Sequence, residues 1–257
     1  MQFHANWRFT GLLKCLEVSK RFGGLQALKN VNCTIDAGEI AGLVGPNGSG
    51  KSTLLNIISG VYKPDSGKIL FADRDISKMP PYEVCTNGIT KTAQTVQSFP
   101  EMTAIDNVLT SVLFNQKKAE KTDPKEKAKE LLEFVGLSKE KIELKAKKLN
   151  VIELRRIQLA KALATNPKLL LLDELLTGLT PKETDHAVEI IKEINRQGVT
   201  VLIVEHVMRV IMGLCNRVIV LHHGEKICEG SPKEVCLDNN VVQVYLGKRF
   251  TFGEENI

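Results

Sequence analysis

The feature that most constrains this chain is a glycine-rich run at residues 45–53, which reads Gly45-Pro46-Asn47-Gly48-Ser49-Gly50-Lys51-Ser52-Thr53. A short apolar run, Glu39–Val44, precedes it, and residues 54–58 continue with helical spacing. The pattern G-x-x-x-x-G-K-S between a strand and a helix is typical of a loop whose backbone N–H groups surround phosphate oxygens. The helix N-terminus adds partial positive charge at the same point. The run therefore predicts a nucleoside triphosphate site, in preference to an ordinary glycine-rich surface loop.

Two side chains of this run have predicted roles of their own. Lys51 is long enough to reach the β- and γ-phosphates, and the Ser52 hydroxyl is a candidate ligand of Mg²⁺. All nine residues, 45–53, are therefore candidate nucleotide-binding residues.

Composition excludes several classes of protein. Hydrophobic residues make up 43% of the 257 residues and charged residues 25%, as in ordinary globular proteins. The cysteines at positions 15, 33, 85, 215, 228 and 236 form no C-x-x-C pair, so reduced, buried thiols are expected instead of a disulfide framework or a structural metal site. No apolar run approaches the roughly 18 residues that span a bilayer, and residues 1–10 lack the apolar core of a secretory signal. Any membrane role is expected to depend on partner chains.

The net charge of +5 is concentrated in one segment. Residues 117–148 contain eleven Lys and seven Asp or Glu, which gives +4. A solvated, lysine-rich helical surface is the first expectation, and attraction to anionic lipid head groups is the alternative. No nucleic-acid partner is expected, because no aromatic residues are interleaved with these lysines.

Strand and helix patterns divide the chain into three kinds of segment. Strands with intervening turn signals are expected at residues 12–18, 28–35 and 67–72, which predicts an antiparallel sheet beside the nucleotide-binding core. Residues 100–149 have the pattern of a mostly helical insertion. After Asn150, strands at 168–173, 200–204 and 218–221 alternate with helices at 181–197 and 207–214. This alternation predicts an α/β fold with a parallel sheet.

An acidic pair follows the buried run at 169–172, which is Leu-Leu-Leu-Leu. Asp173 is placed at the carboxyl end of that strand, where a carboxylate can hold Mg²⁺ directly or through water. Glu174, one residue further, can accept a proton from a water that attacks the γ-phosphate. A solvated turn would also carry two acids, but the neighbouring phosphate loop favours the site.

Gln94 and His206 become candidates through their positions. Gln94 lies at the junction between the core and the helical insertion, where its side chain would sense the γ-phosphate. His206 follows the apolar strand at 201–204 and an acid, and its imidazole can bond to the γ-phosphate.

With these residues in order, the chain resembles the ATP-binding subunits of ABC transporters from about Leu12 to Gly247. The motifs are the phosphate loop, Gln94, a signature-like segment at 149–153, the Asp173-Glu174 strand and His206. It is most similar to the branched-chain amino acid importer subgroup, on the residues Arg21-Phe22-Gly23-Gly24-Leu25, Lys91-Thr92-Ala93-Gln94, Thr177-Gly178-Leu179 and Val204-Glu205-His206-Val207-Met208.

The resemblance implies an architecture: one ABC ATP-binding domain over residues 1–257, with a RecA-like P-loop NTPase core (12–96 and 155–247), an antiparallel β subdomain and a helical subdomain at about 97–154. It implies ATP and Mg²⁺ as cofactors, Phe22 stacked on adenine, and Ser52, Gln94 and Asp173 at the metal. Glu174, His206 and Gln94 would be the catalytic residues. The protein would be cytoplasmic and peripheral on the inner face of the cell membrane.

The resemblance also implies partners. The family's ATPases work as head-to-tail dimers, so a second ATP-binding subunit is expected, either a copy of this chain or a different one. Transmembrane permease subunits and, indirectly, a solute-binding protein would complete the transporter.

Three departures from the family pattern concern the contact with that second subunit. The signature segment reads Leu149-Asn150-Val151-Ile152-Glu153, with Ile152 where the family keeps glycine. A branched side chain there hinders close approach of the backbone to a partner's γ-phosphate. Helix initiation is expected to survive, because Asn150 and Glu153 form a capping-box pattern. Leu175 replaces the usual proline, and Thr180 replaces an aspartate or asparagine.

The functional prediction is an ATP-hydrolysing transporter subunit whose own phosphate loop is intact and whose signature segment is impaired. A low-turnover regulatory subunit is the first alternative, favoured by Ile152 and opposed by the intact Glu174 and His206. A non-transport ABC ATPase is the second, opposed by the lack of tandem nucleotide domains and heptad arms. A phosphate-loop GTPase or kinase leaves Gln94, the signature region and His206 unexplained.

Overall fold

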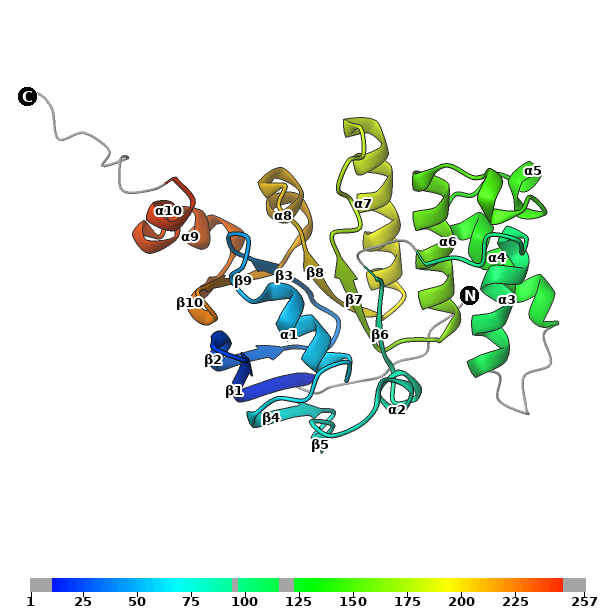
Figure 1. Ribbon diagram of the computed structural model, residues 1–257. Coiled ribbons are helices and arrows are strands. Elements are labelled where there is room, and N and C mark those ends of the chain that lie inside the picture. Colours follow the sequence, from blue (N-terminus) through cyan, green and yellow to red (C-terminus); the bar gives the residue numbers. More distant parts are fainter. Residues whose placement is uncertain (1–10, 94–96, 116–122, 247–257) are drawn as a thin grey trace, which may run out of the picture.

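A parallel sheet forms the centre of the molecule (Figure 1). The computed structural model describes residues 11–93, 97–115 and 123–246. Within them the central sheet has the strand order β10-β9-β3-β8-β7-β6. Its strands are β3 (Ile40–Val44), β6 (Ile89–Lys91), β7 (Leu169–Asp173), β8 (Thr200–Val204), β9 (Arg217–His222) and β10 (Glu225–Gly230). All neighbours pair in parallel except β10, which pairs antiparallel with β9 at the edge. The predicted parallel α/β sheet is confirmed.

A second, antiparallel sheet lies beside it, as predicted, with the order β2-β1-β4-β5. Its strands are β1 (Leu13–Phe22), β2 (Leu25–Ile35), β4 (Ser66–Phe71) and β5 (Arg74–Asp75). The β1–β2 hairpin continues beyond the predicted strand ends, because Phe22 pairs with Leu25 across the turn at Gly23 and Gly24. This extension brings Phe22 to the tip of the hairpin.

Alternate residues of each central strand belong to two different hydrophobic cores. Leu170 and Leu172 of β7 pack in the core that includes the helices of residues 104–164 and 190–214. Leu169 and Leu171 pack in the core shared with the helix of residues 51–58 and the antiparallel sheet. The continuous apolar run of the sequence is therefore a strand buried on both faces.

Helices lie on both faces of the central sheet, and those of residues 104–164 form one group at the end of the molecule away from β10 (Figure 1). The helices are α1 (Lys51–Ile58), α2 (Pro81–Thr86), α3 (Ala104–Asn115), α4 (Pro124–Phe134), α5 (Lys139–Ile142), the 3-10 turn η1 (Ala146–Lys148), α6 (Val151–Ala164), α7 (Pro181–Arg196), α8 (Met208–Leu214), α9 (Pro232–Leu237) and α10 (Asn239–Leu246). Helices α2, α9 and α10 have no counterpart in the sequence predictions. The proposed subdomain boundary at residues 154–155 falls inside α6, so the division into core and helical subdomain stays a prediction.

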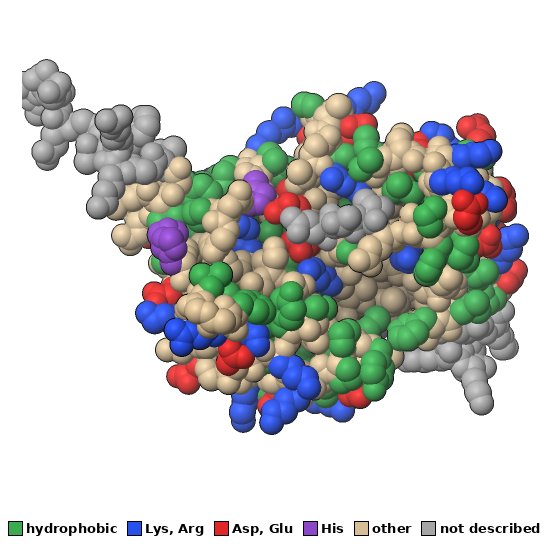
Figure 2. All heavy atoms as spheres, in the orientation of Figure 1, with side chains coloured by type: hydrophobic (Ala, Val, Ile, Leu, Met, Phe, Trp, Pro, Cys, Tyr) green, Lys and Arg blue, Asp and Glu red, His purple; other side chains and the backbone are tan. Residues whose placement is uncertain are grey.

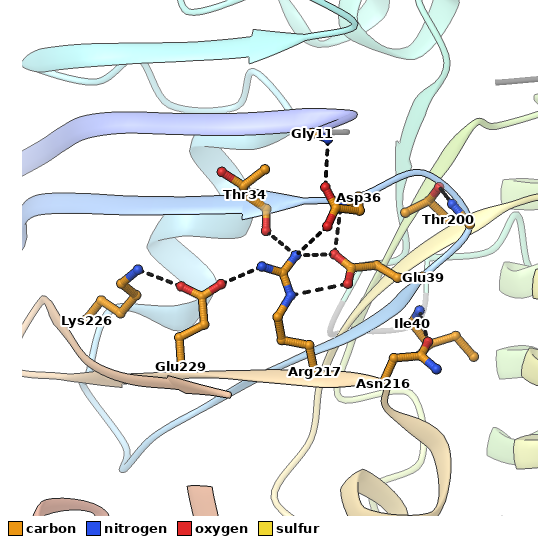
Figure 3. A network of polar contacts seen from close by, with 11 residues as sticks. Gly11, Thr34, Asp36, Glu39, Ile40, Thr200, Asn216, Arg217, Lys226 and Glu229 are labelled. Atoms are coloured by element: carbon orange, nitrogen blue, oxygen red, sulfur yellow. Dashed lines mark hydrogen bonds and ion pairs between the residues drawn. The ribbon is translucent and has the colours of Figure 1, made fainter. Parts of the chain in front are cut away.

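Arg217, at the start of β9, joins the two sheets (Figure 3). Its guanidinium bonds to the Glu39 carboxylate, to Glu229 Oε1 at 2.6 Å and to the Thr34 carbonyl at 2.7 Å. Asp36 Oδ2 lies 3.7 Å away, and the same carboxylate accepts the N–H of Gly11. One partly buried cation thus connects β2, the turn before β3, β9 and β10.

Candidate functional site

The phosphate loop connects β3 to α1, and its backbone geometry requires glycine at two positions. Gly45 has φ 149°, and a Cβ added to it would lie 2.1 Å from the carbonyl oxygen of Leu221. Gly50 has φ 104°, and its Cβ would lie 2.7 Å from the carbonyl oxygen of Ala27. No side chain fits at either position without movement of a neighbouring backbone, so the spacing of these glycines follows from packing as well as from ligand approach.

Lys51, the first residue of α1, is folded against its own loop. Its ammonium donates to the carbonyl oxygens of Gly45, at 2.8 Å, and Pro46, at 2.9 Å. Burial lowers the pKa of Lys51, while the nearby carboxylates of Glu174 and Asp173 act in the opposite direction. The ammonium is therefore held by weak carbonyl acceptors that phosphate oxygens can replace.

The loop opens onto a cleft of about 670 Å³, within the range of small-molecule sites. Its walls come from the β1–β2 hairpin, the phosphate loop and the ends of β7 and β8. The lining residues are Phe22, Leu25, Gln26, Ala27, Asn47, Gly48, Ser49, Gly50, Lys51, Ser52, Thr53, Glu174 and His206. Most of the residues predicted for nucleotide binding and catalysis thus share one cleft.

Glu174 and His206 follow adjacent parallel strands, and their side chains meet. The Nε2 atom of His206 lies 2.8 Å from Oε1 of Glu174. Glu174 adopts a left-handed backbone, φ 52°, and its N–H donates to the carbonyl of Val204 at 3.0 Å. Residues in this conformation are uncommon outside glycine and cluster at functional sites. The turn after β7 therefore aims the carboxylate at the histidine across the sheet edge.

Asp173 is buried beneath the cleft, with 2% of its surface exposed. Its Oδ2 lies 3.0 Å from the ammonium of Lys91, and its N–H donates to the Thr92 hydroxyl at 3.3 Å. Its other oxygen, Oδ1, is buried and has no hydrogen-bond partner among the described residues. A buried, unpaired carboxylate oxygen fits a magnesium ion, or a water bound to one.

The described part of the chain contains no group of three or more His, Cys, Asp or Glu that could hold a metal ion. Magnesium does not need such a group, because it is usually held by one or two carboxylates together with substrate phosphates.

Phe22 stands at the tip of the hairpin with 41% of its surface exposed. The ring of Tyr62 meets it edge-on, with centroids 5.2 Å apart, and the Lys20 ammonium lies 5.5 Å from its centroid. An exposed aromatic ring at the rim of the cleft is able to stack on a flat base.

Gln94, a predicted site residue, lies outside the described residues.

Two residues without a predicted role, Glu205 and Lys91, also join the site. Glu205 is 1% exposed, and its Oε1 accepts the N–H of Leu176 at 2.7 Å. Burial raises its pKa, and the charge of Glu174 adds to the rise. Glu205 directly precedes His206, and Lys91 lies three residues before Gln94. This closeness in sequence to two predicted site residues is the signal by which both could have been found.

The signature-like segment begins α6 with the predicted capping box. Asn150 Oδ1 accepts the N–H of Glu153 at 2.9 Å, and Glu153 Oε2 accepts the N–H of Asn150 at 3.0 Å. Val151 is 60% exposed at the end of the helix. Ile152 lines a small cavity of about 40 Å³ together with Leu175 and Leu179. The residue in place of glycine therefore packs toward the loop that follows Glu174.

A second groove, of about 400 Å³, lies between α1, α2 and β6. Exposed Val61 is in its lining, and the exposed rings of Tyr82 and Phe99 belong to neighbouring segments. Figure 2 shows hydrophobic side chains around a hollow near the middle of this face.

Among the described helices, none is long and apolar enough to cross a membrane.

Comparison with known proteins agrees with this geometry. The sequence pattern of the family described as ABC transporter matches residues 28–177. The high-affinity branched-chain amino acid transport ATP-binding protein LivG of Escherichia coli (strain K12) is 35% identical over 254 residues, covering 92% of this chain and 98% of LivG. The corresponding protein BraF of Pseudomonas aeruginosa is 32% identical, covering 92% of this chain and 98% of BraF.

Solved structures give the same result. The ADP conformation of MJ1267, an ATP-binding cassette of an ABC transporter, is similar with TM-score 0.83 at 33% identity, covering 93% of this chain and 100% of that one. A dimeric structure of MJ0796, a bacterial ABC transporter cassette, is similar with TM-score 0.79 at 30% identity, covering 86% of this chain and 98% of that one.

Proposed function

This chain belongs to the ABC transporter family, and from that premise we propose that it is the ATP-hydrolysing subunit of an importer for branched-chain amino acids. The choice of solute is supported by the names of similar proteins, LivG and BraF. The observation that carries the ATPase assignment is the single cleft that joins the phosphate loop to Glu174 and His206.

In the proposed reaction, the loop N–H groups and Lys51 bind the triphosphate, and Phe22 stacks on the adenine. Glu174 accepts the proton of the attacking water, and its contact with His206 orients both side chains. His206 and Gln94 would bond to the γ-phosphate or the water. Ser52, Asp173 and Gln94 would hold magnesium, which when bound neutralises charge on the phosphate oxygens.

The proposed partners are a second ATP-binding subunit, transmembrane permease subunits and, through them, a solute-binding protein. The groove between α1, α2 and β6 supports the permease contact, because exposed apolar side chains lie in and beside it. The protein would then be peripheral on the cytoplasmic face of the membrane.

Within a head-to-tail pair, we propose that the two nucleotide sites differ. The site on this chain's phosphate loop would receive its missing half from the partner. The partner's site would face the start of α6, where Val151 and Ile152 replace the flexible backbone that close phosphate approach requires. A partner with an intact signature segment would therefore leave one competent site, on this chain.

The proposal is tested by co-expressing the chain with candidate permease and ATPase subunits and reconstituting the complex in vesicles. Uptake of labelled leucine that depends on ATP, and its loss in Glu174→Gln, is the expected result. If the complex hydrolyses ATP but takes up no branched-chain amino acid, the proposed solute is wrong. Retained hydrolysis in Glu174→Gln would refute the site.

A low-turnover regulatory subunit is the second candidate, because Ile152 lies at the signature position. The two candidates are distinguished by comparing the ATP hydrolysis rates of complexes that carry the wild-type chain and Glu174→Gln. If the substitution abolishes hydrolysis, the regulatory role is excluded. If hydrolysis is insensitive to the substitution, the regulatory role is supported.

A further inference from the structure

Lys91 makes an ion pair that the proposed mechanism does not use. It is the last residue of β6, the strand that pairs in parallel with β7. Its ammonium lies 3.0 Å from Oδ2 of Asp173 and donates to Oδ1 of Asn56, on α1, at 2.7 Å. Lys91 therefore connects the strand end that carries the candidate metal ligand to the helix that follows the phosphate loop.

The ion pair between Lys91 and Asp173 is largely buried. The side chain of Asp173 is 1% exposed and that of Lys91 is 15% exposed. A buried carboxylate is costly unless a cation or a hydrogen-bond donor compensates it. Lys91 supplies that compensation at one oxygen only, because Oδ1 has no partner among the described residues.

The same pairing opposes a metal ion. A dication bound at Oδ1 would lie within a few ångströms of the ammonium on Oδ2, and two cations repel strongly in a site shielded from water. Asp173 on its own therefore offers a metal little net charge. Triphosphate oxygens would bring the missing negative charge, after which one carboxylate oxygen suffices.

We propose that Lys91 is a positioning residue that neutralises Asp173 while nucleotide is absent, so that the metal is bound only together with the nucleotide phosphates. This inference rests on the proposed function. It assigns Lys91 a role in metal affinity, separate from the chemistry of hydrolysis.

The test is the binding of Mn²⁺ to the full chain without nucleotide, followed by the electron paramagnetic resonance of the free ion. Lys91→Met should bind Mn²⁺ roughly tenfold more tightly than wild type, the size of effect that one neighbouring charge has on a carboxylate's proton affinity. Lys91→Arg, which keeps the charge, should behave as wild type. The gain should disappear in Lys91→Met combined with Asp173→Asn.

With a non-hydrolysable ATP analogue present, the difference between Lys91→Met and wild type should shrink. Equal Mn²⁺ affinity of the two proteins without nucleotide, or a gain that persists after Asp173→Asn, would overturn the proposal. Thermal unfolding of each variant shows whether it is folded.

A different experimental result is expected if the proposed function itself is wrong. ATP binding measured in excess chelator does not depend on the metal, so a wild-type chain that binds no ATP refutes the nucleotide site itself. The Mn²⁺ comparison without nucleotide still decides the role of Lys91.

Discussion

Glu174 combines an uncommon backbone conformation with a direct contact to His206, and both features serve the position of one carboxylate. Glu174→Gln keeps the size of the side chain but removes the proton acceptor. We expect ATP hydrolysis by the assembled complex to fall by about 10²- to 10⁴-fold, the usual contribution of a general base, with ATP binding retained. Steady-state hydrolysis and binding of a fluorescent ATP analogue measure the two effects.

The matched control is Glu189→Gln, an exposed glutamate on α7 whose carboxylate pairs only locally with Lys192 and Arg196 among the described residues. It should hydrolyse ATP at the wild-type rate. Equal loss in both variants would mean that Glu174 acts through general electrostatics instead of proton transfer.

Glu205 predicts a pH dependence of stability. Burial, followed by the charge of Glu174, raises its pKa above the ordinary value of 4.5. The folded protein therefore binds this proton more tightly than the unfolded chain does. The resulting stabilisation is complete below about pH 4.5 and is lost as the pH rises through the raised, folded pKa.

Glu205→Gln keeps an acceptor for the N–H of Leu176 and carries no charge. Its free energy of unfolding relative to wild type should therefore increase as the pH rises from the ordinary glutamate value of 4.5 through the raised, folded pKa. Urea denaturation over this range measures it, with the exposed Glu140→Gln on α5 as the control. A difference that does not change with pH would contradict the assignment.

At the residue scale, sequence alone could predict the members of the site but only some of their contacts. Glu174 and His206 each follow an apolar strand, and adjacent parallel strands bring their carboxyl ends together. The Lys91–Asp173 pair depends on which strand β6 joins, and the Glu205–Leu176 bond on the path of a loop. Neither is encoded in local spacing.

At the element scale, Arg217 holds together strands that are far apart in the sequence. Arg217→Met keeps most of the apolar stem but leaves the carboxylates of Glu39 and Glu229 without their main partner. We expect a loss of about 1–3 kcal/mol in the free energy of unfolding, typical of a partly buried polar group left unpaired. Urea denaturation at neutral pH measures it.

Arg217→Lys is the informative comparison, because one ammonium cannot replace a guanidinium that bonds in three directions. It should recover only part of the loss. Full stability in Arg217→Met would show that the two sheets are held by apolar packing alone.

Helix α6 offers a test of its capping box. Asn150→Ala removes the acceptor for the N–H of Glu153 and should cost about 1 kcal/mol, whereas Asn150→Ser retains an acceptor and should cost little. The difference in denaturation midpoint between the two variants measures the cap. Equal stability would mean that the contact between Glu153 and Lys141 holds the helix start without it.

At the scale of the whole molecule, the proposed asymmetry of the dimer leads to a gain-of-function prediction. Ile152→Gly restores the backbone that close phosphate approach requires. It should cost about 1 kcal/mol of helix stability, yet raise hydrolysis by the complex with an intact partner about twofold, because a second site becomes competent. Hydrolysis by the reconstituted complex is the measurement.

The control places glycine at a half-buried α6 position far from the signature segment, Lys161→Gly, which shares the cost in helix propensity but leaves the signature position branched. If both variants hydrolyse ATP at the same rate, Ile152 does not limit the second site.

The global architecture was largely predictable because its signals are periodic. The apolar run at 169–172 and the alternation of strands and helices require a sheet covered on both faces. Helices α2, α9 and α10 were missed because each is short, at six to eight residues, and short helices owe their stability to neighbours instead of to their own sequence.

The unbroken course of α6 has a mechanical consequence. Its 14 residues make a rod of about 21 Å. One end carries Val151 on the surface, and at the other the hydroxyl of Thr165 meets that of Thr90, one residue before Lys91, at 2.6 Å. A rigid tilt of about 10° at one end moves the other by about 4 Å over that length. If α6 moves as a rigid body, a neighbouring subunit that displaces Val151 would therefore also displace the segment beside Lys91.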